Sequence, residues 1–426
     1  MAKTLKILML VENASWPGDQ RVKNEAAALS DCGFQVCIIC PKTPTGTQHQ
    51  ESHICIDNIH IYRYKLPTLS NKYAAYILEY SLALIKTFWM SLMVLFRHGF
   101  HVIHAANPPD LFFTMGLFYR LFGKKFIFDQ HDLAPELFKV KFKNRMNLLY
   151  KLQLFFEKRS YRIADMVIVT NLSQKQKAIE RGRCPTDKVI VVRNGPDLER
   201  IKLVSPEPEL KRGRRFLLAY VGEMAVQDGV DHILYALDEL VHQRGRQDVS
   251  LVLMGDGQHA PELHALAHKL QLDDYVNFTG WAKSEDLVRY LTVADVGLLP
   301  DPRNGLNELS TMVKTMEYMA MGKPIVSFEL AETRYSAQEA ALYATPNVVE
   351  DFADKIEVLL NDEELRLKMG AIGRKRVLEE LSWDQTKKNL LLAYKILFPA
   401  CQEAVVVPHP RQDIDQEKVA HNITVN

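Results

Sequence analysis

The cysteines of this sequence do not indicate a redox or metal-binding protein. The six cysteines are scattered without pairing, and Cys37 and Cys40 form a C-x-x-C inside FQVCIICP, an apolar run that predicts a buried strand. A redox or zinc site needs such a motif at a turn or at the start of a helix, so neither is favoured. Unpaired cysteines are typical of a reducing, cytosolic setting.

The sequence also lacks an excess of charge, and its start does not have the pattern expected of a leader segment. A formal net charge of +1 over 426 residues gives no global signal for nucleic acid, so any basic patch must be local. The start, MAKTLKILMLVENA, has no small-residue cleavage site and predicts a first strand rather than a signal peptide.

Strand and helix patterns alternate along the chain, which predicts an α/β fold with parallel sheets. One set runs from KILMLVE to KVIVVRNG and a second from FLLAYVGE to VADVGLLP, with the charged, Pro-containing linker LVSPEPELKRGRR between them. We therefore expect two Rossmann-like domains facing a cleft, over residues 1–200 and 214–380. A helix over 383–398 is expected to pack back on the first domain, and the polar tail 399–426 to be disordered.

The stretch from Asp301 to Gly322, DPRNGLNELSTMVKTMEYMAMG, predicts a loop followed by an amphipathic helix. Ser310 or Thr311 can cap this helix, and Gly322 ends it. Ser310, Lys314 and Glu317 then share one face, where the helix start and the lysine suit a diphosphate and the carboxylate suits a ribose diol. A core helix with a solvated polar stripe is the alternative.

Two other segments are apolar or basic enough to suggest a surface role. Residues 74–96 approach the length of a membrane span, but Glu79 and Lys86 favour a core helix or a helix with an exposed apolar flank. The segment 138–162, FKVKFKNRMNLLYKLQLFFEKRSYR, interleaves basic and apolar residues and favours an anionic membrane surface. Nucleic acid is the weaker alternative, since no recognition motif accompanies it.

The order of the motifs resembles that of retaining GT-B glycosyltransferases of the family-four type, over nearly the whole chain to about Phe398. The matching pieces are PGDQRVKNEAAAL, HD, ADMVIVTN, VVRNGPD, YVGE, LVLMGDG, NFTGW, ADVGLLP and KTMEYMAMGKPIV. The QDGVD and NELSTMVKTMEYM variants resemble bacterial enzymes that build surface polysaccharides on lipid carriers. The resemblance implies that residues 1–200 form the acceptor side, that 214–380 bind the nucleotide sugar, and that anomeric configuration is retained.

The resemblance also assigns donor-binding residues in the second domain. Glu317 matches the carboxylate that binds the ribose hydroxyls. A dinucleotide-binding fingerprint is excluded because Ala260 replaces its third glycine. The glycine loops and the residue near the base that the resemblance implies are Gly222, Glu223, Gly255, Asp256, Gly257 and Trp281.

Two departures from the family pattern concern charge. Leu309 stands where the family has its first glutamate, and whether Glu308 or Asn307 substitutes for it is left open. Glu223 and Asp228 stand near the family's Arg and Lys, so another group must neutralise the diphosphate.

Our candidate for this neutralising group is Lys314, aided by the helix start at Ser310 and Thr311, with Arg193 second. An alternative for Arg193 is a plain surface residue.

In the first domain, His131 follows the strand KFIFD and is expected to face the cleft, where the family's histidine contacts the donor sugar or the reacting centre. A strand-end histidine with ordinary hydrogen bonds is the alternative. We therefore predict His131, Glu308 and Lys314 as catalytic. The predicted acceptor-binding residues are Gly18, Asp19, Arg21, Asp132 and Glu136.

No metal or cofactor is expected. The only D-x-D, Asp413–Asp415, lies in the tail, and a departing diphosphate can be stabilised by lysine, a helix dipole and backbone donors.

The sequence thus predicts a cytoplasmic, peripheral enzyme at the inner face of the cell membrane. It would transfer a sugar, from a UDP-sugar by preference, to a lipid-linked or saccharide acceptor in polysaccharide biosynthesis. A nucleotide-sugar-binding pseudoenzyme or scaffold, and a GT-B epimerase or phosphorylase, are the alternatives. The donor sugar, the acceptor and the oligomeric state stay open.

Overall fold

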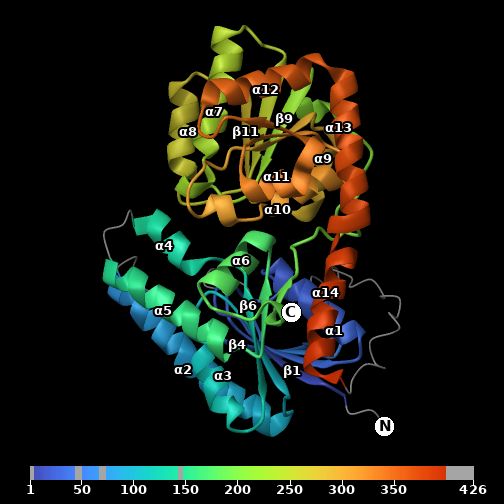
Figure 1. Cartoon of the computed structure of the whole chain (residues 1–426). Coiled ribbons are helices and arrows are strands. Elements are labelled where there is room, and N and C mark those ends of the chain that lie inside the picture. Colours follow the sequence, from blue (N-terminus) through green and yellow to red (C-terminus); the bar gives the residue numbers. More distant parts are fainter. Residues whose placement is uncertain (1–3, 44–49, 67–72, 143–146, 400–426) are drawn as a thin grey trace, which may run out of the picture. The chain divides into compact units, whose positions relative to one another are not determined.

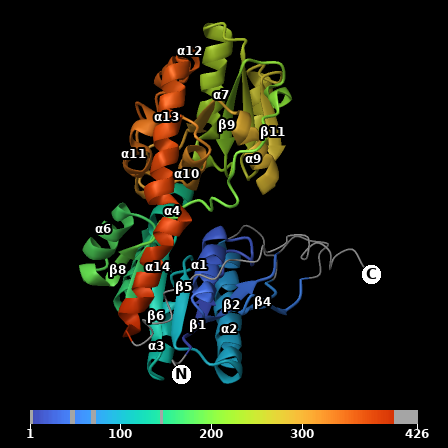
Figure 2. The same cartoon turned by 90° about the vertical axis from the view of Figure 1, so that its right-hand side faces the viewer.

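The computed structural model describes residues 4–43, 50–66, 73–142 and 147–399 (Figures 1 and 2). The tail beyond residue 399, the Asp413–Asp415 motif, and Lys143 and Arg145 of the basic segment lie outside the described residues.

The chain divides into two compact units. The first unit comprises Met1–Ala106, Thr114–Ile127 and Leu391–Asn426, and the second comprises Asn107–Phe113 and Phe128–Leu390. The domain boundaries expected at residues 200–214 remain a prediction. All strands of one sheet nevertheless precede the linker, and all strands of the other follow it.

The first sheet has eight strands in the order β3-β4-β2-β1-β5-β6-β7-β8. The neighbours β4, β2, β1 and β5 are parallel, and β3 runs antiparallel at the edge. Their bounds are β1 Lys6–Leu10, β2 Gln35–Pro41, β3 His53–Ile56, β4 Ile59–Tyr64, β5 Val102–Ala106, β6 Lys125–Gln130, β7 Met166–Val169 and β8 Val189–Val191.

The hairpin β3–β4 was missed in the sequence. Asp57 and Asn58 between its strands both have positive φ, 48° and 64°, which is the geometry of a tight two-residue hairpin turn. Cys37 and Cys40 are buried in β2, as predicted, and burial raises the pKa of both thiols.

In the described part of the chain, six α-helices fall between the strands of the first sheet. Asp19 caps the first of them, accepting a hydrogen bond from the backbone of Val22 at 3.1 Å. The apolar segment predicted over 74–96 is a single helix, and its part Leu78–Arg97 is long and apolar enough to cross a membrane. The helices are α1 Gln20–Asp31, α2 Tyr73–Arg97, α3 Phe113–Arg120, α4 Ala134–Phe142, α5 Asn147–Ile163 and α6 Leu172–Glu180.

The C-terminal helix, α14 Trp383–Leu397, contacts β5 of the first sheet. The hydroxyl of Tyr394 lies 2.8 Å from Nδ1 of His104, and its ring packs on Phe34.

The second sheet has six parallel strands in the order β11-β10-β9-β12-β13-β14. The strands are β9 Phe216–Val221, β10 Val249–Met254, β11 Val276–Gly280, β12 Val296–Leu299, β13 Ile325–Phe328 and β14 Ala341–Ala344. The helices are α7 Val230–Asp238, α8 Ala260–Lys269, α9 Ser284–Val293, α10 Val313–Ala320, α11 Ala331–Ala337, α12 Val349–Asn361 and α13 Glu363–Arg376.

Both faces of this sheet are covered, because alternate residues of each strand point to opposite sides. Leu218 and Tyr220 of β9 pack with α7, α8 and α12 in one core, and Leu217 and Ala219 pack with α9 and α10 in the other (Figure 1). A sheet buried on both faces leaves its strand-end loops as the place for ligands.

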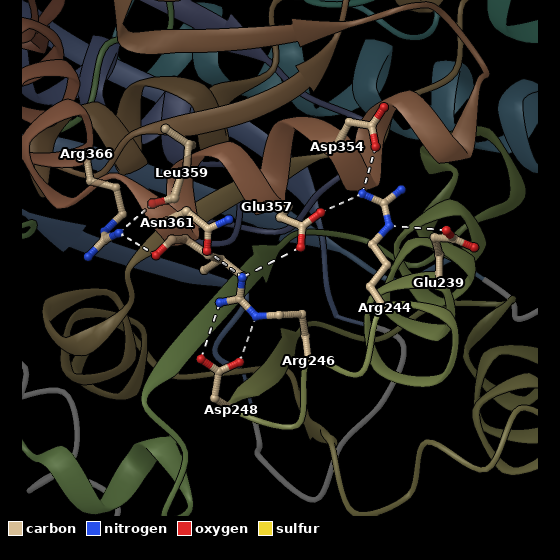
Figure 3. A network of polar contacts seen from close by, with 10 residues as sticks. Glu239, Arg244, Arg246, Asp248, Asp354, Glu357, Leu359, Asn361 and Arg366 are labelled. Carbon is tan, nitrogen blue, oxygen red and sulfur yellow. Dashed lines mark hydrogen bonds and ion pairs between the residues drawn. The ribbon is translucent and has the colours of Figure 1, made fainter.

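A network of ion pairs fixes the end of this sheet where β10 begins. Figure 3 shows Arg244 between Glu239, Asp354 and Glu357, with Arg246 reaching Asp248 just before the strand. These contacts join the segment after α7 to α12. They lie at the amino end of β10, away from the loops that follow the strands.

Candidate active site

Two glycine loops, which follow β9 and β10, lie directly against each other. Gly222 and Gly255 have φ of +144° and +154°, and a Cβ added to Gly255 would stand only 1.8 Å from the carbonyl oxygen of Gly222. The backbone N–H of Gly222 donates to Met254, and that of Met224 to Asp256, at 3.0 and 2.9 Å. Only glycine permits this approach of two backbones, which is the property a phosphate-binding loop needs.

The other predicted residues of these loops are mostly at the surface. Glu223 and Asp256 are exposed, and a Cβ on Gly257 would lie 2.5 Å from the carbonyl oxygen of Met224. Trp281, after β11, is 67% exposed. An exposed indole of this kind is free to stack on a ligand.

The prediction that Ser310 or Thr311 caps the helix α10 is wrong. The helix begins at Val313, its N-cap is Met312, and no side chain caps it. Ser310 instead donates its hydroxyl to the carbonyl of Leu306 at 2.9 Å, because a 3₁₀ turn over residues 307–309 precedes it. Ser310 therefore does not share the helix face of Lys314.

The helix ends as predicted, but its polar stripe is not solvated, because Lys314 and Glu317 are both buried. Met316, Met319 and Ala320 are buried in the core beside α9, and Gly322 follows the helix with φ of +66°. No side chain caps the first turn, and of its N–H groups that of Thr315 donates to the carbonyl of Met312 at 3.1 Å. The positive end of the helix dipole at this turn favours an anion.

Lys314 reaches the glycine loop from the first turn of this helix. Its Nζ lies 3.2 Å from Oδ1 of Asp301 and 3.3 Å from the hydroxyl of Tyr220, and a Cβ on Gly222 would lie 3.6 Å from it. The lysine thus lies beside the loop, and its role in neutralising the diphosphate stays a prediction. It already has a buried carboxylate partner, whose other oxygen, Oδ2, has no hydrogen-bond partner among the described residues.

Asp228 is a second carboxylate near Lys314, in addition to Asp301. Burial raises the pKa of Asp228 to about 6, while nearby Lys314 lowers it and Asp301 raises it. The next residue, Gly229, packs against the carbonyl of Pro300, just before Asp301. Near the position where the family has a cation, this chain thus has the carboxyl group of Asp228, which lies close enough to Lys314 to interact with it.

Glu317, one turn after Lys314, is paired with an arginine that sequence reasoning missed. Its Oε1 lies 2.9 Å from a guanidinium nitrogen of Arg200, which also donates to Ser284 at 3.4 Å. Arg200 follows the VVRNGPD motif at a distance of only a few residues. No local spacing in the sequence pairs Arg200 with Glu317, which lies 117 residues further along the chain.

Arg193, the second candidate for the diphosphate, also has a carboxylate partner. Its guanidinium lies 3.2 Å from Glu332 and 4.3 Å from the ring centre of Tyr335. The same carboxylate accepts hydrogen bonds from the backbone of Ser173 and the hydroxyl of Thr311. Arg193 is buried, so the alternative of a plain surface residue is wrong.

Thr311 is held from another direction by Asn171, at the start of α6. The Asn171 amide donates to Thr311 Oγ1 at 3.0 Å and to the carbonyl of Leu309 at 2.9 Å. These bonds join the end of β7 to the loop before α10, within the second unit.

Asn307 and Glu308 are the two residues that could take the place of the family's first glutamate, and they lie in different environments. Asn307 is buried, and its amide donates to the carbonyls of Gln227 and Pro302, both at 2.9 Å. Glu308 is more accessible and forms an ion pair with Arg303 at 3.1 Å. Asn307 thus holds the loop, and Glu308 is the carboxylate that a ligand can reach.

His131 directly follows β6 and is oriented by an acid. Its Nε2 lies 2.7 Å from Oδ2 of Asp129, and its backbone carbonyl accepts from Gln174 at 3.3 Å. The backbone N–H groups of His131 and Asp132 both donate to Oδ1 of the buried Asn107, at 2.6 and 3.1 Å. The carboxylate of Asp129 thus fixes the orientation of the imidazole ring at the end of β6.

The remaining first-sheet candidates serve local contacts. Glu136 forms an ion pair with Arg181 at 2.6 Å, and Arg181 also pairs with Glu157, whose pKa burial raises to about 8. In the first unit, Arg21 pairs with Glu25 at 3.1 Å.

Asp19 caps α1, and Gly18 donates to the carbonyl of Ser15 at 2.7 Å. A role in acceptor binding for these two residues and for Asp132 stays a prediction.

Two family profiles match consecutive parts of the chain. The profile of Glycosyltransferase Family 4 matches residues 19–200, and that of Glycosyl transferases group 1 matches residues 215–362. Together they span most of the chain.

Curated relatives match over shorter lengths. An alpha-D-kanosaminyltransferase of Streptomyces kanamyceticus is 30% identical over 157 residues, which are 36% of this chain and 39% of the relative. A GDP-mannose-dependent alpha-(1-6)-phosphatidylinositol monomannoside mannosyltransferase of Mycobacterium tuberculosis is 26% identical over 208 residues, 46% of this chain and 53% of the relative. The chain thus spans about half or less of the length of these relatives.

Solved structures match over nearly the whole length. Sucrose-phosphate synthase from Thermosynechococcus elongatus superposes with a TM-score of 0.76 at 19% identity, covering 93% of this chain and all of that one. The Anabaena protein HepE in complex with UDP-glucose gives 0.68 at 15% identity and the same coverage. At these identities the likeness shows the fold, which is GT-B.

Proposed function

The chain belongs to the family-four type of GT-B glycosyltransferases, and we propose that it transfers a sugar from a nucleotide-diphosphate sugar to a lipid-linked or saccharide acceptor. A UDP-sugar is the favoured donor, since the similar HepE structure holds UDP-glucose. The lipid-linked acceptor is favoured because one relative is named for a phosphatidylinositol mannoside substrate.

One observation carries the proposal. Lys314 Nζ, the uncapped start of α10 and the paired loops at Gly222 and Gly255 meet at the carboxyl end of β9, with Glu317 one turn further along. Backbone donors and a cation suit a diphosphate, and a carboxylate suits the two hydroxyls of a ribose. We expect the phosphates to take over Lys314 from Asp301.

The proposed reaction depends on stabilising the negative charge of the leaving diphosphate. As the bond between the sugar and the diphosphate breaks, negative charge grows on the leaving phosphate, and Lys314 with the N–H groups of α10 stabilises it. We propose that the donor is used without a metal ion and that the transferred sugar retains its anomeric configuration. In this scheme His131, held by Asp129, contacts the transferred sugar, and Glu308 approaches it from the loop before α10.

We further propose that the enzyme works in the cytoplasm at the inner face of the membrane, in polysaccharide assembly. The basic composition of residues 138–162 supports an anionic surface as partner.

A thermal-shift panel tests the donor proposal. UDP, GDP, ADP and their common sugars are added with and without magnesium, and a ligand at a hundredfold excess over its Kd stabilises by about 2.7 kcal/mol. We expect one nucleotide to raise the Tm independently of magnesium, and Lys314→Ala to abolish the shift. A shift that needs magnesium would overturn metal independence, and no shift at all would overturn donor binding.

A second function is a donor-binding pseudoenzyme or scaffold. It is favoured by one observation: Lys314, Arg200 and Arg193 are each paired with a carboxylate. Slow hydrolysis of the bound donor, followed by NMR of the released sugar, separates the two. Release of the retained anomer supports the enzyme, and binding without any turnover supports the scaffold. An epimerase or phosphorylase would be recognised by its product in the same spectrum.

A further inference from the structure

The first unit carries an apolar stripe along its longest helix. On α2, Leu78, Ile85, Trp89, Met93 and Phe96 follow one another at intervals of three, four or seven residues, so they share one face. All five are exposed, with Trp89 at 66% and Phe96 at 85%. Single exposed apolar residues are ordinary, but a contiguous stripe marks an interaction surface.

The helix α3 extends this stripe. The rings of Phe88 and Phe118 meet edge to face at 5.1 Å, and the hydroxyls of Ser91 and Tyr119 lie 2.7 Å apart, so α2 and α3 are packed together. Leu121, at the end of α3, is 81% exposed. Leu117 and Phe122 beside it are exposed as well.

A groove of about 370 Å³ lies between the two helices. It is lined by Leu84, Ile85, Phe88, Trp89, Thr114 and Met115, of which only the threonine is polar. The stripe on α2, the exposed end of α3 and this groove form what we term the α2–α3 surface.

Cations border the α2–α3 surface at the end where Phe96 and Leu121 lie. Arg97 follows Phe96, Arg120 precedes Leu121, and Lys124 and Lys125 come shortly after. Between residues 80 and 128 the sequence holds one carboxylate, Asp110, which is fully buried. At that end the rim of the surface therefore carries one sign, whereas the partly exposed Glu79 follows Leu78 at the other end.

The opposite face of α2 belongs to the core. Ala83, Thr87, Ser91 and Val94 are buried, and α2 packs against β2 and β4. Although Leu78–Arg97 has the length and composition of a membrane span, leaving the sheet would expose this face. The helix is thus suited to lie on a bilayer rather than to cross it.

We propose that the α2–α3 surface docks the protein on an anionic lipid bilayer. In the docked state Phe96, Leu121 and Phe122 enter the boundary between headgroups and acyl chains, and the flanking cations contact lipid phosphates. The proposal rests on the proposed function, since a lipid-linked acceptor would be presented at such a surface. It places the apolar contact with the bilayer on α2 and α3 rather than on the basic segment 138–162.

The charge favours a bilayer over a second copy of the chain. A copy would bring the same cations to the contact, and neither partner has an accessible carboxylate in this segment to pair with them. Anionic headgroups, in contrast, are attracted to these cations.

Co-sedimentation with vesicles tests the proposal. Vesicles of phosphatidylcholine alone and with phosphatidylglycerol are mixed with the full chain, with Phe96→Asp/Leu121→Asp, and with Leu367→Asp as a control at an exposed leucine of α13. We expect binding to the anionic vesicles only, a loss of at least tenfold in the partition coefficient for the double variant, and none for the control. Arg120→Glu/Lys124→Glu should weaken binding at low salt and remove its salt dependence.

Three results would overturn the proposal. These are unchanged vesicle binding by the double variant, loss of binding only in Lys139→Glu/Lys141→Glu, and a dimer in light scattering that the double variant converts to a monomer while no vesicle binding occurs. Nucleotide binding is measured on the same proteins. A chain that binds vesicles but no nucleotide contradicts the proposed function and leaves the docking surface standing.

Discussion

Lys314 and Asp301 form a buried ion pair, with 3.2 Å between Nζ and Oδ1, behind the glycine loop at Gly222. The lysine side chain is 9% exposed and that of the aspartate 1%, so little water screens the pair. A donor diphosphate must compete with this aspartate for the ammonium group. In the free protein Asp301 thus holds Lys314 in place and lowers the affinity of the site for an anion.

Asp301→Asn is therefore expected to tighten donor binding. The amide keeps the shape of the side chain but removes the competing charge, and we expect the Kd of a UDP-sugar to fall by roughly tenfold, which is about 1.4 kcal/mol. Calorimetric titration measures it. Asp295→Asn is the matched control, because Asp295 pairs with Lys211 just before β12, whereas Asp301 lies just after it. Weaker binding by Asp301→Asn would mean that Asp301 is needed to position Lys314.

Asp228 predicts a pH dependence of the same binding. Its pKa is raised to about 6, first by burial, and Lys314, Asp301 and Glu223 face it. Below pH 6 the carboxyl is neutral in the folded protein and opposes the diphosphate less. We expect the affinity for a UDP-sugar, whose phosphates stay ionised, to rise severalfold from pH 7.5 to pH 5.5.

Asp228→Asn should bind at pH 7.5 as the unaltered protein does at pH 5.5, without further change. The stability effect has a matching sign: a carboxyl with a raised folded pKa binds its proton more readily when folded, so it favours folding as the pH falls from about 6 toward 4. A pH profile that the substitution leaves unchanged would assign the effect to another group.

Glu317 is expected to bind the ribose hydroxyls. Because it pairs with Arg200, the alternative is that it only holds Arg200 in position. If Glu317 binds the diol, Glu317→Gln should weaken UDP by roughly tenfold and 2′-deoxy-UDP much less, since a hydrogen bond to a charged group contributes about 1.5–3 kcal/mol. Equal losses for both nucleotides would mean that Glu317 acts by holding Arg200. Glu308→Gln, on the neighbouring loop, should leave UDP binding unchanged.

The sequence predicted the fold because the signals are periodic and repeated. Strands such as β2 and β10 are continuous apolar runs, which mark a sheet buried on both faces, and helix and loop alternate between them. The hairpin β3–β4 escaped because its strand β3 lies half exposed at the edge, and its turn, Asp57–Asn58, lacks the usual glycine.

The sequence indicated which strand-end loops form the candidate site, but not the ion-pair partners of the residues in them. Lys314 and Gly222 could be placed together because both belong to local motifs at strand ends. Asp301 and Arg200, in contrast, meet their partners through tertiary contacts that no local spacing encodes. The cap at Ser310 failed for a local reason: the 3₁₀ turn over residues 307–309 precedes it, the helix begins only at Val313, and the Ser310 hydroxyl donates to the carbonyl of Leu306.

Gly255 is expected to tolerate no side chain. A Cβ there would meet the carbonyl oxygen of Gly222 at 1.8 Å, at a φ of +154° that side chains avoid. Gly255→Ala should abolish nucleotide binding and lower the Tm, as the two loops must separate. Gly305→Ala, where nothing lies within 4 Å, should do neither. Normal nucleotide binding by Gly255→Ala would remove the paired loops from the donor site.

Asn107 is expected to set the position of the His131 loop. Its Oδ1 accepts from the backbone of His131 and Asp132, and its Nδ2 donates to Asp110 and to the carbonyl of Asp132, both at 2.8 Å. Asn107→Ala would leave two backbone N–H groups without their acceptor, at about 1–3 kcal/mol each. We expect kcat to fall at least tenfold while donor Kd stays the same, because the donor loops belong to the other sheet.

The comparison that isolates this role is Asn107→Asp, which keeps the acceptor but turns a second carboxylate toward Asp110. Burial raises the pKa of Asp110 to about 7, so the two acids can share a proton at low pH and repel each other when both are ionised. The variant should recover much of kcat near pH 6 and lose it toward pH 8. Asn389→Ala, which removes an exposed bond to the carbonyl of Val191, serves as the control. If Asn107→Ala folds and turns over normally, the clamp on His131 does not contribute to catalysis.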